Sequence, residues 1–163
     1  MNALEKYITL HEQLLSDNIK LSSFDNHYYN TLPKEDKELI LIDLKKGKYH
    51  TILLNSSIKV GVIGYIPTKM DPKIGFLQII IDPKYRSKGI FSKSIKLLAK
   101  EHNLKEVWST IKKDNIVSIK AHLKDGFKQF SEDKLEQWRE VYLLDPDEVR
   151  LYKKFSNKEQ IID

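Results

Sequence analysis

The chain has 163 residues, of which 40% are hydrophobic and 31% are charged, and its formal net charge is +5. This length and composition are typical of one globular domain and exclude an intrinsically disordered chain. The absence of cysteine excludes disulfides, thiolate metal sites and cysteine nucleophiles. No apolar run approaches the ~20 residues of a membrane span and no signal-peptide pattern is present, so we expect a cytoplasmic protein.

Hydrophobic periodicity predicts helices and strands that alternate along the chain. Helices are predicted where apolar residues recur every three or four positions, and strands where short β-branched runs are closed by turn residues. In chain order we expect a helix at Asn2–Leu15, a strand at Ile19–Phe24, a helix at Pro33–Lys45, strands at Tyr49–Leu54, Lys59–Ile66 and Gly75–Ile81, a helix at Phe91–His102, a strand at Glu106–Ile111, a helix capped by Asp114 or Asn115 and ended by Gly126, and strands at Phe127–Phe130 and Val149–Phe155. Residues 1–155 should form a single domain, and residues 156–163 a frayed tail.

Two of these helices have apolar residues that should face the core. They are Leu39, Ile42 and Leu44 in the early helix, and Ile116, Ile119 and Leu123 in the late one. The segment Ser131–Glu148 is acidic, is longer than a tight hairpin needs and has no predicted element.

The stretch Gly75–His102 combines a buried strand, a basic turn and a helix. The first N–H groups of a helix lack internal partners, and the helix dipole is positive at that end. Such a turn can bind a phosphate, and Gly89 would let the anion approach the backbone. From these residues alone, an ordinary strand–helix connection with solvated lysines is an equally good interpretation.

Charge is distributed unevenly along the chain. Residues 84–128 contain twelve Lys or Arg against four Asp or Glu, whereas residues 131–148 contain two against seven. A basic middle segment suits phosphate binding, and it could instead suit nucleic acid, which we consider a less favoured partner, or consist of solvated lysines.

Two motifs resemble those of one known family. Arg86-x-x-Gly89-x-Phe91 resembles the Arg/Gln-x-x-Gly-x-Gly/Ala signature of the GNAT superfamily of acyl-CoA N-acyltransferases, with Ser87 and Phe91 as departures from the usual small residues. Asn115–Phe127 is similar to the family's late helix, Asn-x-x-Ser/Ala followed by Tyr or His and then Gly-Phe. The resemblance implies an α/β (α+β) fold: a mixed, mostly antiparallel central sheet of six to seven strands, helices on both faces, and a splayed parallel pair.

The resemblance also implies a function and a set of site residues. The function is transfer of an acetyl group from acetyl-CoA to a primary amine of a small molecule or peptide. The residues expected to contact acetyl-CoA are Ile79, Ile80, Ile81, Arg86, Ser87, Lys88, Gly89, Ile90, Phe91, Asn115 and Ser118. No metal is expected, because the five histidines are scattered without metal-ligand spacing.

His122 and Gln78 are the candidate catalytic residues. His122 stands where the family has its proton donor, and a histidine can act as acid or base near neutral pH. Gln78 stands where relatives carry a Glu, but Gln cannot take a proton, so the base could also be His27, a water chain or none. From the residues alone, a helix histidine that only hydrogen-bonds is the favoured interpretation of His122, and Asn115 could equally be only a helix cap.

The candidate substrate-binding residues fall in two separate segments. His27, Tyr28 and Tyr29 follow the first strand, while Glu136 and Trp138 belong to the acidic segment, which would attract a cationic amine. Packed aromatic residues and a solvated loop are the alternatives. Two other functions stay open: a module that binds CoA without turning it over, and an acetyltransferase whose acceptor amine is carried on tRNA. The resemblance also allows a homodimer.

Overall fold

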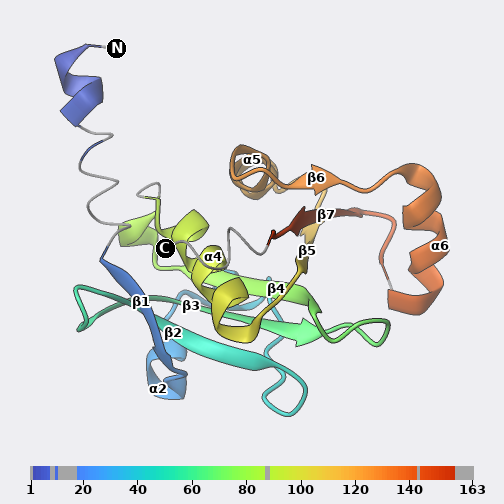
Figure 1. Ribbon diagram of the computed structural model, residues 1–163, viewed down its shortest axis with the longest axis horizontal. Helices are drawn as coiled ribbons and strands as arrows, with labels where there is room; N and C mark the ends of the chain where they lie inside the picture. Colours follow the sequence, from blue (N-terminus) through green and yellow to red (C-terminus); the bar gives the residue numbers. More distant parts are fainter. Residues whose placement is uncertain (1, 8–9, 11–17, 87–88, 143, 157–163) are drawn as a thin grey trace.

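A central sheet of seven strands, in the order β1-β2-β3-β4-β5-β7-β6, organises the computed structural model of this chain (Figure 1). The structure describes residues 2–7, 10, 18–86, 89–142 and 144–156. The strands are β1 (Ile19–Ser23), β2 (Lys48–Leu54), β3 (Ile58–Pro67), β4 (Ile74–Ile81), β5 (Glu106–Lys112), β6 (Lys128–Gln129) and β7 (Glu148–Lys154). The helices are α2 (Asn26–Tyr29), α3 (Lys34–Lys37), α4 (Ile90–His102), α5 (Ile116–Lys124) and α6 (Glu132–Tyr142), with a 3-10 turn at Pro83–Tyr85.

The sheet contains one parallel pair, formed by β4 and β5. The strands β1 to β4 pair antiparallel in sequence order, and β5 pairs antiparallel with β7 over its whole length. Between β4 and β5 only three residue pairs form, from Ile74 with Glu106 to Phe76 with Trp108. Beyond Phe76 the two strands separate, and β5 turns toward β7 (Figure 1). This arrangement confirms the predicted mixed, mostly antiparallel sheet with a splayed parallel pair.

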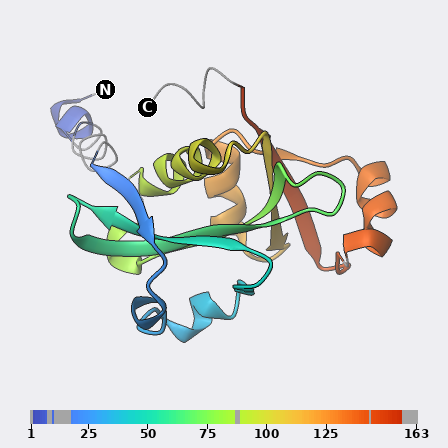
Figure 2. The same ribbon diagram turned by 60° about the horizontal axis from the view of Figure 1, so that its bottom comes forward.

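Hydrophobic residues cover both faces of the sheet. On one face, Ile95 and Leu98 of α4 are fully buried in a cluster with side chains of β2, β3, β4 and β5. On the other face, Val62 and Ile80 pack against Leu32, beneath α2 and α3. Figure 2 shows α4 on one side of the sheet and the two short helices on the opposite side.

A third cluster lies at the α6 end of the molecule. Trp108 and Phe130 are buried there with Ile74 from β4, Leu135 from α6 and Leu144. The rings of Trp108 and Phe130 meet edge to face at 5.5 Å, a favourable geometry for aromatic pairs. The acidic segment, for which no element was predicted, therefore contains a helix that packs on the sheet.

The predicted helix Pro33–Lys45 is wrong beyond Lys37. Leu39 and Leu44, expected in the core, are 59% and 60% exposed, and Ile42 is half-buried. Two hydrogen bonds join the backbone of residues 38–47 to the sheet: the Leu41 carbonyl accepts from the Gln78 side chain, and the Asp43 N–H donates to the Tyr49 hydroxyl. These bonds to side chains of β2 and β4 replace the helical bonds of Leu41 and Asp43.

The predicted burial of the late helix is also partly wrong. Ile116 and Leu123 are 52% and 49% exposed, although Asn115 caps the helix as expected. The helix is turned so that Ile119 and His122 face the core, and His122 is its one buried residue. The buried residue of α5 is thus the polar His122, whereas periodicity predicted that the neighbouring Leu123 would be buried.

The two ends of the chain are described only in part. Residues 3–7 are helical, with Leu4 and Tyr7 exposed, whereas most of the rest of the predicted helix Asn2–Leu15 lies outside the described residues. Of the predicted tail only Ser156 is described. Within the described ranges, no helix has the length and apolar character needed to cross a membrane.

Candidate active site

The separation of β4 and β5 opens the hydrogen-bonding edge of β4 in the middle of the sheet. Leu77–Ile81 remain paired with β3 on one side, but their ladder with β5 has ended. An extended ligand that carries amides can pair along such an edge as an added strand. The side chains of Ile80 and Ile81 are buried and that of Ile79 is half-buried, so any ligand contact at these positions would use the backbone.

The start of α4 lies at the open end of this separation. Its N-cap is Gly89, which has φ +77° in the left-handed region that favours glycine, and no described side chain caps the helix. By contrast, α5 is capped by its own Asn115, whose Oδ1 accepts from the Ser118 N–H at 3.2 Å. The first N–H groups of α4, at Ile90 and Phe91, are therefore available to an anion. Ser87 and Lys88 lie outside the described residues.

Arg86 joins the turn to a neighbouring helix. Its Nε donates to the Ile81 carbonyl at 3.0 Å, and its Nη2 lies 2.8 Å from Oδ1 of Asp36 in α3. Arg86, which was predicted to bind phosphate, is thus held at the end of β4, and its positive charge is partly balanced by the Asp36 carboxylate. The side chain is 47% exposed, so it can still reach a phosphate at the turn.

His122 lies beside the point where β4 and β5 separate. It is 5% exposed, its Nδ1 is 2.7 Å from the Ser118 carbonyl, and its Nε2 is 2.9 Å from Oγ of Ser109 on β5. The rings of Phe91 and Phe127 contact the imidazole edge to face at 4.9 and 4.8 Å. Burial lowers the pKa of His122, against the opposing effects of the Ser118 carbonyl and the Asp125 carboxylate. The ring is therefore neutral at pH 7.

Asp125 braces this region from the end of α5. It accepts from the Ser92 hydroxyl of α4, and its Oδ2 lies 3.2 Å from Nζ of Lys153 on β7. Lys153 also donates to the Asp125 carbonyl at 2.8 Å, and both side chains are largely buried. The contacts join α4, α5 and β7, and so fix the helix that carries His122.

Gln78 lies on the opposite face of β4. Its Oε1 accepts from the Tyr49 hydroxyl and its Nε2 donates to the Leu41 carbonyl, so both polar ends are engaged. These bonds hold residues 38–47 against the sheet. A catalytic role for Gln78 stays a prediction.

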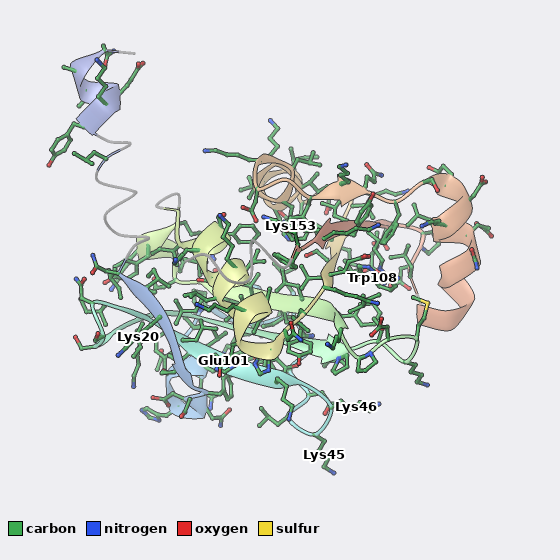
Figure 3. The ribbon with its side chains drawn as sticks, viewed as in Figure 1. Lys20, Lys45, Lys46, Glu101, Trp108 and Lys153 are labelled. Carbon is green, nitrogen blue, oxygen red and sulfur yellow. The ribbon has the colours of Figure 1, made fainter. Side chains whose placement is uncertain are left out.

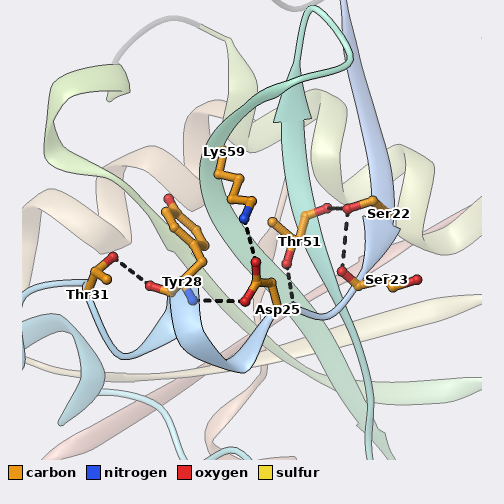
Figure 4. Close-up of polar contacts among 7 residues, drawn as sticks. All are labelled: Ser22, Ser23, Asp25, Tyr28, Thr31, Thr51 and Lys59. Atoms are coloured by element: carbon orange, nitrogen blue, oxygen red, sulfur yellow. Dashed lines mark hydrogen bonds and ion pairs between the residues drawn. The ribbon is translucent and has the colours of Figure 1, made fainter.

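The first group of acceptor candidates lies on α2. Asp25 caps this helix by accepting from the Tyr28 N–H at 3.0 Å, and it also pairs with Lys59 of β3 (Figure 4). Lys59 and the backbone bonds hold the pKa of Asp25 below its ordinary value. Among the described residues the buried Tyr28 hydroxyl has no hydrogen-bond partner, and burial raises the pKa of Tyr28. His27 is exposed, and Tyr29 packs on Phe24 at 5.9 Å.

The second group lies on α6, at the other end of the molecule. Glu136 is exposed and Trp138 belongs to the same helix. In both Figure 1 and Figure 2, α2 and α6 lie at opposite ends of the sheet, so the structure does not bring the two groups together.

A cavity of about 210 Å³ that the sequence did not indicate lies beside α6. It is lined by Met70, Ile74, Glu106, Trp108, Phe130, Lys134, Tyr152 and Lys154. The aromatic rings of Phe130 and Tyr152 are stacked in its wall at 4.6 Å. Among the described residues, no group of three or more His, Cys, Asp or Glu side chains could hold a metal ion.

Ser109 is the site residue that the sequence reasoning missed. The signal was present, because Val107, Ser109 and Ile111 share one face of β5 and all three are buried. A serine in an otherwise apolar row is a candidate for a specific hydrogen bond.

Comparisons with known proteins agree with this geometry. Residues 17–127 match the Acetyltransferase (GNAT) family. No curated protein matches the sequence. The chain is similar in structure to a GNAT-family acetyltransferase from Staphylococcus aureus (18% identity, TM-score 0.59, covering 85% of this chain and 99% of that one). It is also similar to the spermidine N-acetyltransferase of Vibrio cholerae solved with CoA and spermine, with 12% identity and a TM-score of 0.63 over 90% of this chain and 99% of that one. A third neighbour is an acetyltransferase of Bacillus subtilis solved with CoA, with 18% identity and a TM-score of 0.57 over 85% of this chain and 99% of that one. Since the family match covers more than half of the chain, this protein is a member of the GNAT acetyltransferase family.

Proposed function

We propose that this protein transfers an acetyl group from acetyl-CoA to a primary amine of a small molecule or peptide. The observation that carries the proposal is the end of the β4–β5 ladder after three residue pairs, next to a helix start that has a glycine cap. An amide edge and a bare helix start together fit a ligand with an amide-bearing arm and a diphosphate. CoA has both.

Acetyl-CoA would bind along three parts of this site. Its arm would pair with the backbone of Ile79–Ile81, and its diphosphate would accept from the N–H groups at Ile90 and Phe91. Arg86, held at the end of β4, would add positive charge, with Ser87 and Lys88 of the same turn. Asn115 and Ser118 are the proposed contacts from α5. Structural neighbours from Vibrio cholerae and Bacillus subtilis were solved with CoA, which supports this ligand.

Binding in this way would place the thioester where the two strands separate. A backbone N–H near Ile80 or Ile81 would stabilise the charge that develops on the thioester oxygen, an effect worth about 3 kcal/mol of barrier in enzymes that use such donors. The aromatic rings of Phe91 and Phe127, which contact His122 beside this region, would help to exclude water from it. The chain would thus orient the donor and exclude hydrolysis.

The acceptor would approach from the face that carries α2 and α3. His27, Tyr28 and Tyr29 belong to this face, and the unsatisfied Tyr28 hydroxyl is the most direct candidate for a contact with substrate. We propose that the acidic helix α6, with Glu136 and Trp138, attracts a cationic amine from the other end. Two neighbours support an amine acceptor: the spermidine N-acetyltransferase of Vibrio cholerae, which was solved with spermine, and the N-acetyltransferase PseH of Campylobacter jejuni.

The first experiment tests donor binding. Acetyl-CoA should raise the melting temperature of the wild-type protein, and Arg86→Glu should abolish the rise because it places a negative charge beside the diphosphate. Lys45→Glu is the matched control, since Lys45 is an exposed loop lysine away from the site (Figure 3) and should leave the rise intact. If acetyl-CoA gives no rise in the wild type, the proposal fails.

The second experiment tests turnover. Free thiol should appear when acetyl-CoA is mixed with one of several pooled amines, and only in the presence of the protein. A CoA-binding module without catalysis is the second candidate function, and the full engagement of both polar ends of Gln78 favours it. Tight CoA binding without thiol release across a broad amine panel would establish that alternative.

A further inference from the structure

We propose that Ser109 and His122 form a proton relay that carries the acceptor's proton to the departing CoA thiolate. This inference rests on the proposed acetyl transfer and names a catalytic residue, Ser109, that touches the reacting groups.

The position of Ser109 is the first argument. Trp108 is the last residue of β5 that pairs with β4, so Ser109 is the first residue beyond the point of separation. Its hydroxyl is directed to the α5 side of the sheet, where it contacts His122. A thioester bound in the separation would therefore lie against Ser109 rather than against the imidazole, which lies behind it.

The hydrogen bonds of His122 fix which nitrogen carries its proton. A carbonyl oxygen only accepts, so the Ser118 carbonyl requires a proton on Nδ1. In the neutral ring Nε2 then has a free lone pair, and the 2.9 Å contact must be a bond donated by the Ser109 hydroxyl. The Ser109 hydroxyl, the His122 base and the Ser118 carbonyl that orients the base form the kind of hydrogen-bonded series that activates hydroxyl groups in enzymes.

The surroundings keep His122 neutral until a proton arrives. Phe91 of α4 and Phe127 after α5 contact the ring, and burial is the largest effect on its pKa, which it lowers. The Asp125 carboxylate opposes this effect, but it is itself paired with Lys153 of β7. An imidazolium formed here would be a stronger acid than one in water, and so would release its proton readily.

The proposed step conserves atoms and charge. The amine nitrogen bonds to the acetyl carbon, and its extra proton passes between the separated strands, from the α2 side to Oγ of Ser109 on the α5 side, while the Ser109 proton moves to Nε2 of His122. The C–S bond then breaks, and the imidazolium returns its proton through Ser109 to the thiolate. The products are the acetylated amine and CoA thiol, with Ser109 and His122 restored.

The kinetic test compares two buried serines. Ser109→Ala should lower kcat by about 10²-fold and leave KM for acetyl-CoA unchanged, because general acid–base steps contribute at least that much. Ser109→Thr, which keeps the hydroxyl, should recover most of the rate. Ser94→Ala is the control: Ser94 of α4 is fully buried and its hydroxyl has no partner among the described residues, so this variant should retain full activity. Melting temperatures verify that each variant is folded.

The pH profile adds a readout that a structural role would not move. In the wild type kcat should fall as the pH drops through the lowered pKa of His122, because an imidazolium cannot accept a proton. In Ser109→Ala this acidic limb should disappear, since the residual rate no longer passes through His122. An unchanged kcat, or the same acidic limb in Ser109→Ala, would overturn the relay while the proposed acetyl transfer stands.

Nitrogen NMR of histidine-labelled protein tests the pair without turnover. At about pH 7.5 the His122 Nε2 signal should have the shift of an unprotonated ring nitrogen, and Nδ1 that of a protonated one. A proton on Nε2 would overturn the relay even if the protein is active. If the wild type releases no thiol with any amine, the proposed function fails, and the relay fails with it as a catalytic device whatever the tautomer.

Discussion

Two histidines attach helices to this sheet, and they differ in what each imidazole faces. His122 of α5 meets a serine hydroxyl of β5 at the centre of the sheet. His102, at the end of α4, meets a second imidazole, His50 of β2, with 2.7 Å between their Nε2 atoms. A backbone carbonyl orients one ring in each site, Ser118 for His122 and Ser22 for His50.

This difference in what each imidazole faces suggests a catalytic role for the first site and a structural role for the second. A hydroxyl can pass a proton to a ligand that enters the separation of β4 and β5, so the first site can take part in a reaction. The second site lies where β2 packs against the end of α4, two strands away from that separation. Its two imidazoles can only hold α4 on the sheet, so it should affect stability rather than turnover.

Replacing each histidine by glutamine gives the largest expected effect. His122→Gln should lower acetyl transfer by about 10²- to 10⁴-fold, because it removes the group that accepts the proton. His102→Gln should change the rate by less than about threefold and is the matched control. Thiol release at about pH 7.5 measures both rates. Equal losses in the two variants would remove the distinction between the sites.

The ion pair behind His122 gives the next effect. Asp125→Asn should destabilise the protein by about 3 kcal/mol, since it leaves the largely buried Lys153 ammonium without its carboxylate. Urea unfolding measures this change, and Asp125→Asn combined with Lys153→Met should recover most of it. Glu101→Gln is the corresponding change beside His102 and should cost less than about 0.5 kcal/mol, because Glu101 is exposed. A similar cost for both single variants would show that the two sites are braced alike.

Local patterns in the sequence were sufficient to predict most of the sheet. The strands have continuous or alternating apolar residues, and Gly89 and Gly126 mark positions with φ of +77° and +91° that glycine favours. The same kind of signal existed for α6, where Ser131 precedes an acidic first turn and its Oγ accepts from the Lys134 N–H at 3.4 Å. This cap could have predicted a helix in the acidic segment.

The features that the sequence did not predict depend on contacts between distant residues. Nothing within residues 38–47 indicates that the side chain of Gln78, 37 positions after Leu41, will bond to their backbone in place of a helical bond. The pair Ser109–His122 joins two elements, and the pair His50–His102 joins residues 52 positions apart. Periodicity also predicted that Leu123 is buried. In the structure the neighbouring His122 is buried instead, because it bonds to Ser109 of β5.

The smallest expected effect is a pH dependence of stability at the second site. Burial, together with nearby His50, holds the pKa of His102 below its ordinary value of 6.5; Glu101 acts in the opposite direction, and Lys48 lowers it slightly. As the pH falls below 6.5, the unfolded chain takes up the proton before the folded one does, so the free energy of unfolding decreases. The ring is only half-buried, so solvent screening limits the loss to about 0.5 kcal/mol between about pH 7.5 and 5.5.

The buried His122 also makes the free energy of unfolding decrease as the pH falls, and it is unchanged in His102→Gln. The difference between this variant and the wild type therefore isolates the contribution of His102. Urea unfolding at the two pH values should give a smaller decrease for His102→Gln than for the wild type. The Nε2–Nε2 contact explains the sign: only one proton can lie between the two nitrogens, so a second proton forces the rings apart. If the two proteins lose equal stability, the imidazole pair makes no pH-dependent contribution, and α4 is held on β2 by its apolar residues alone.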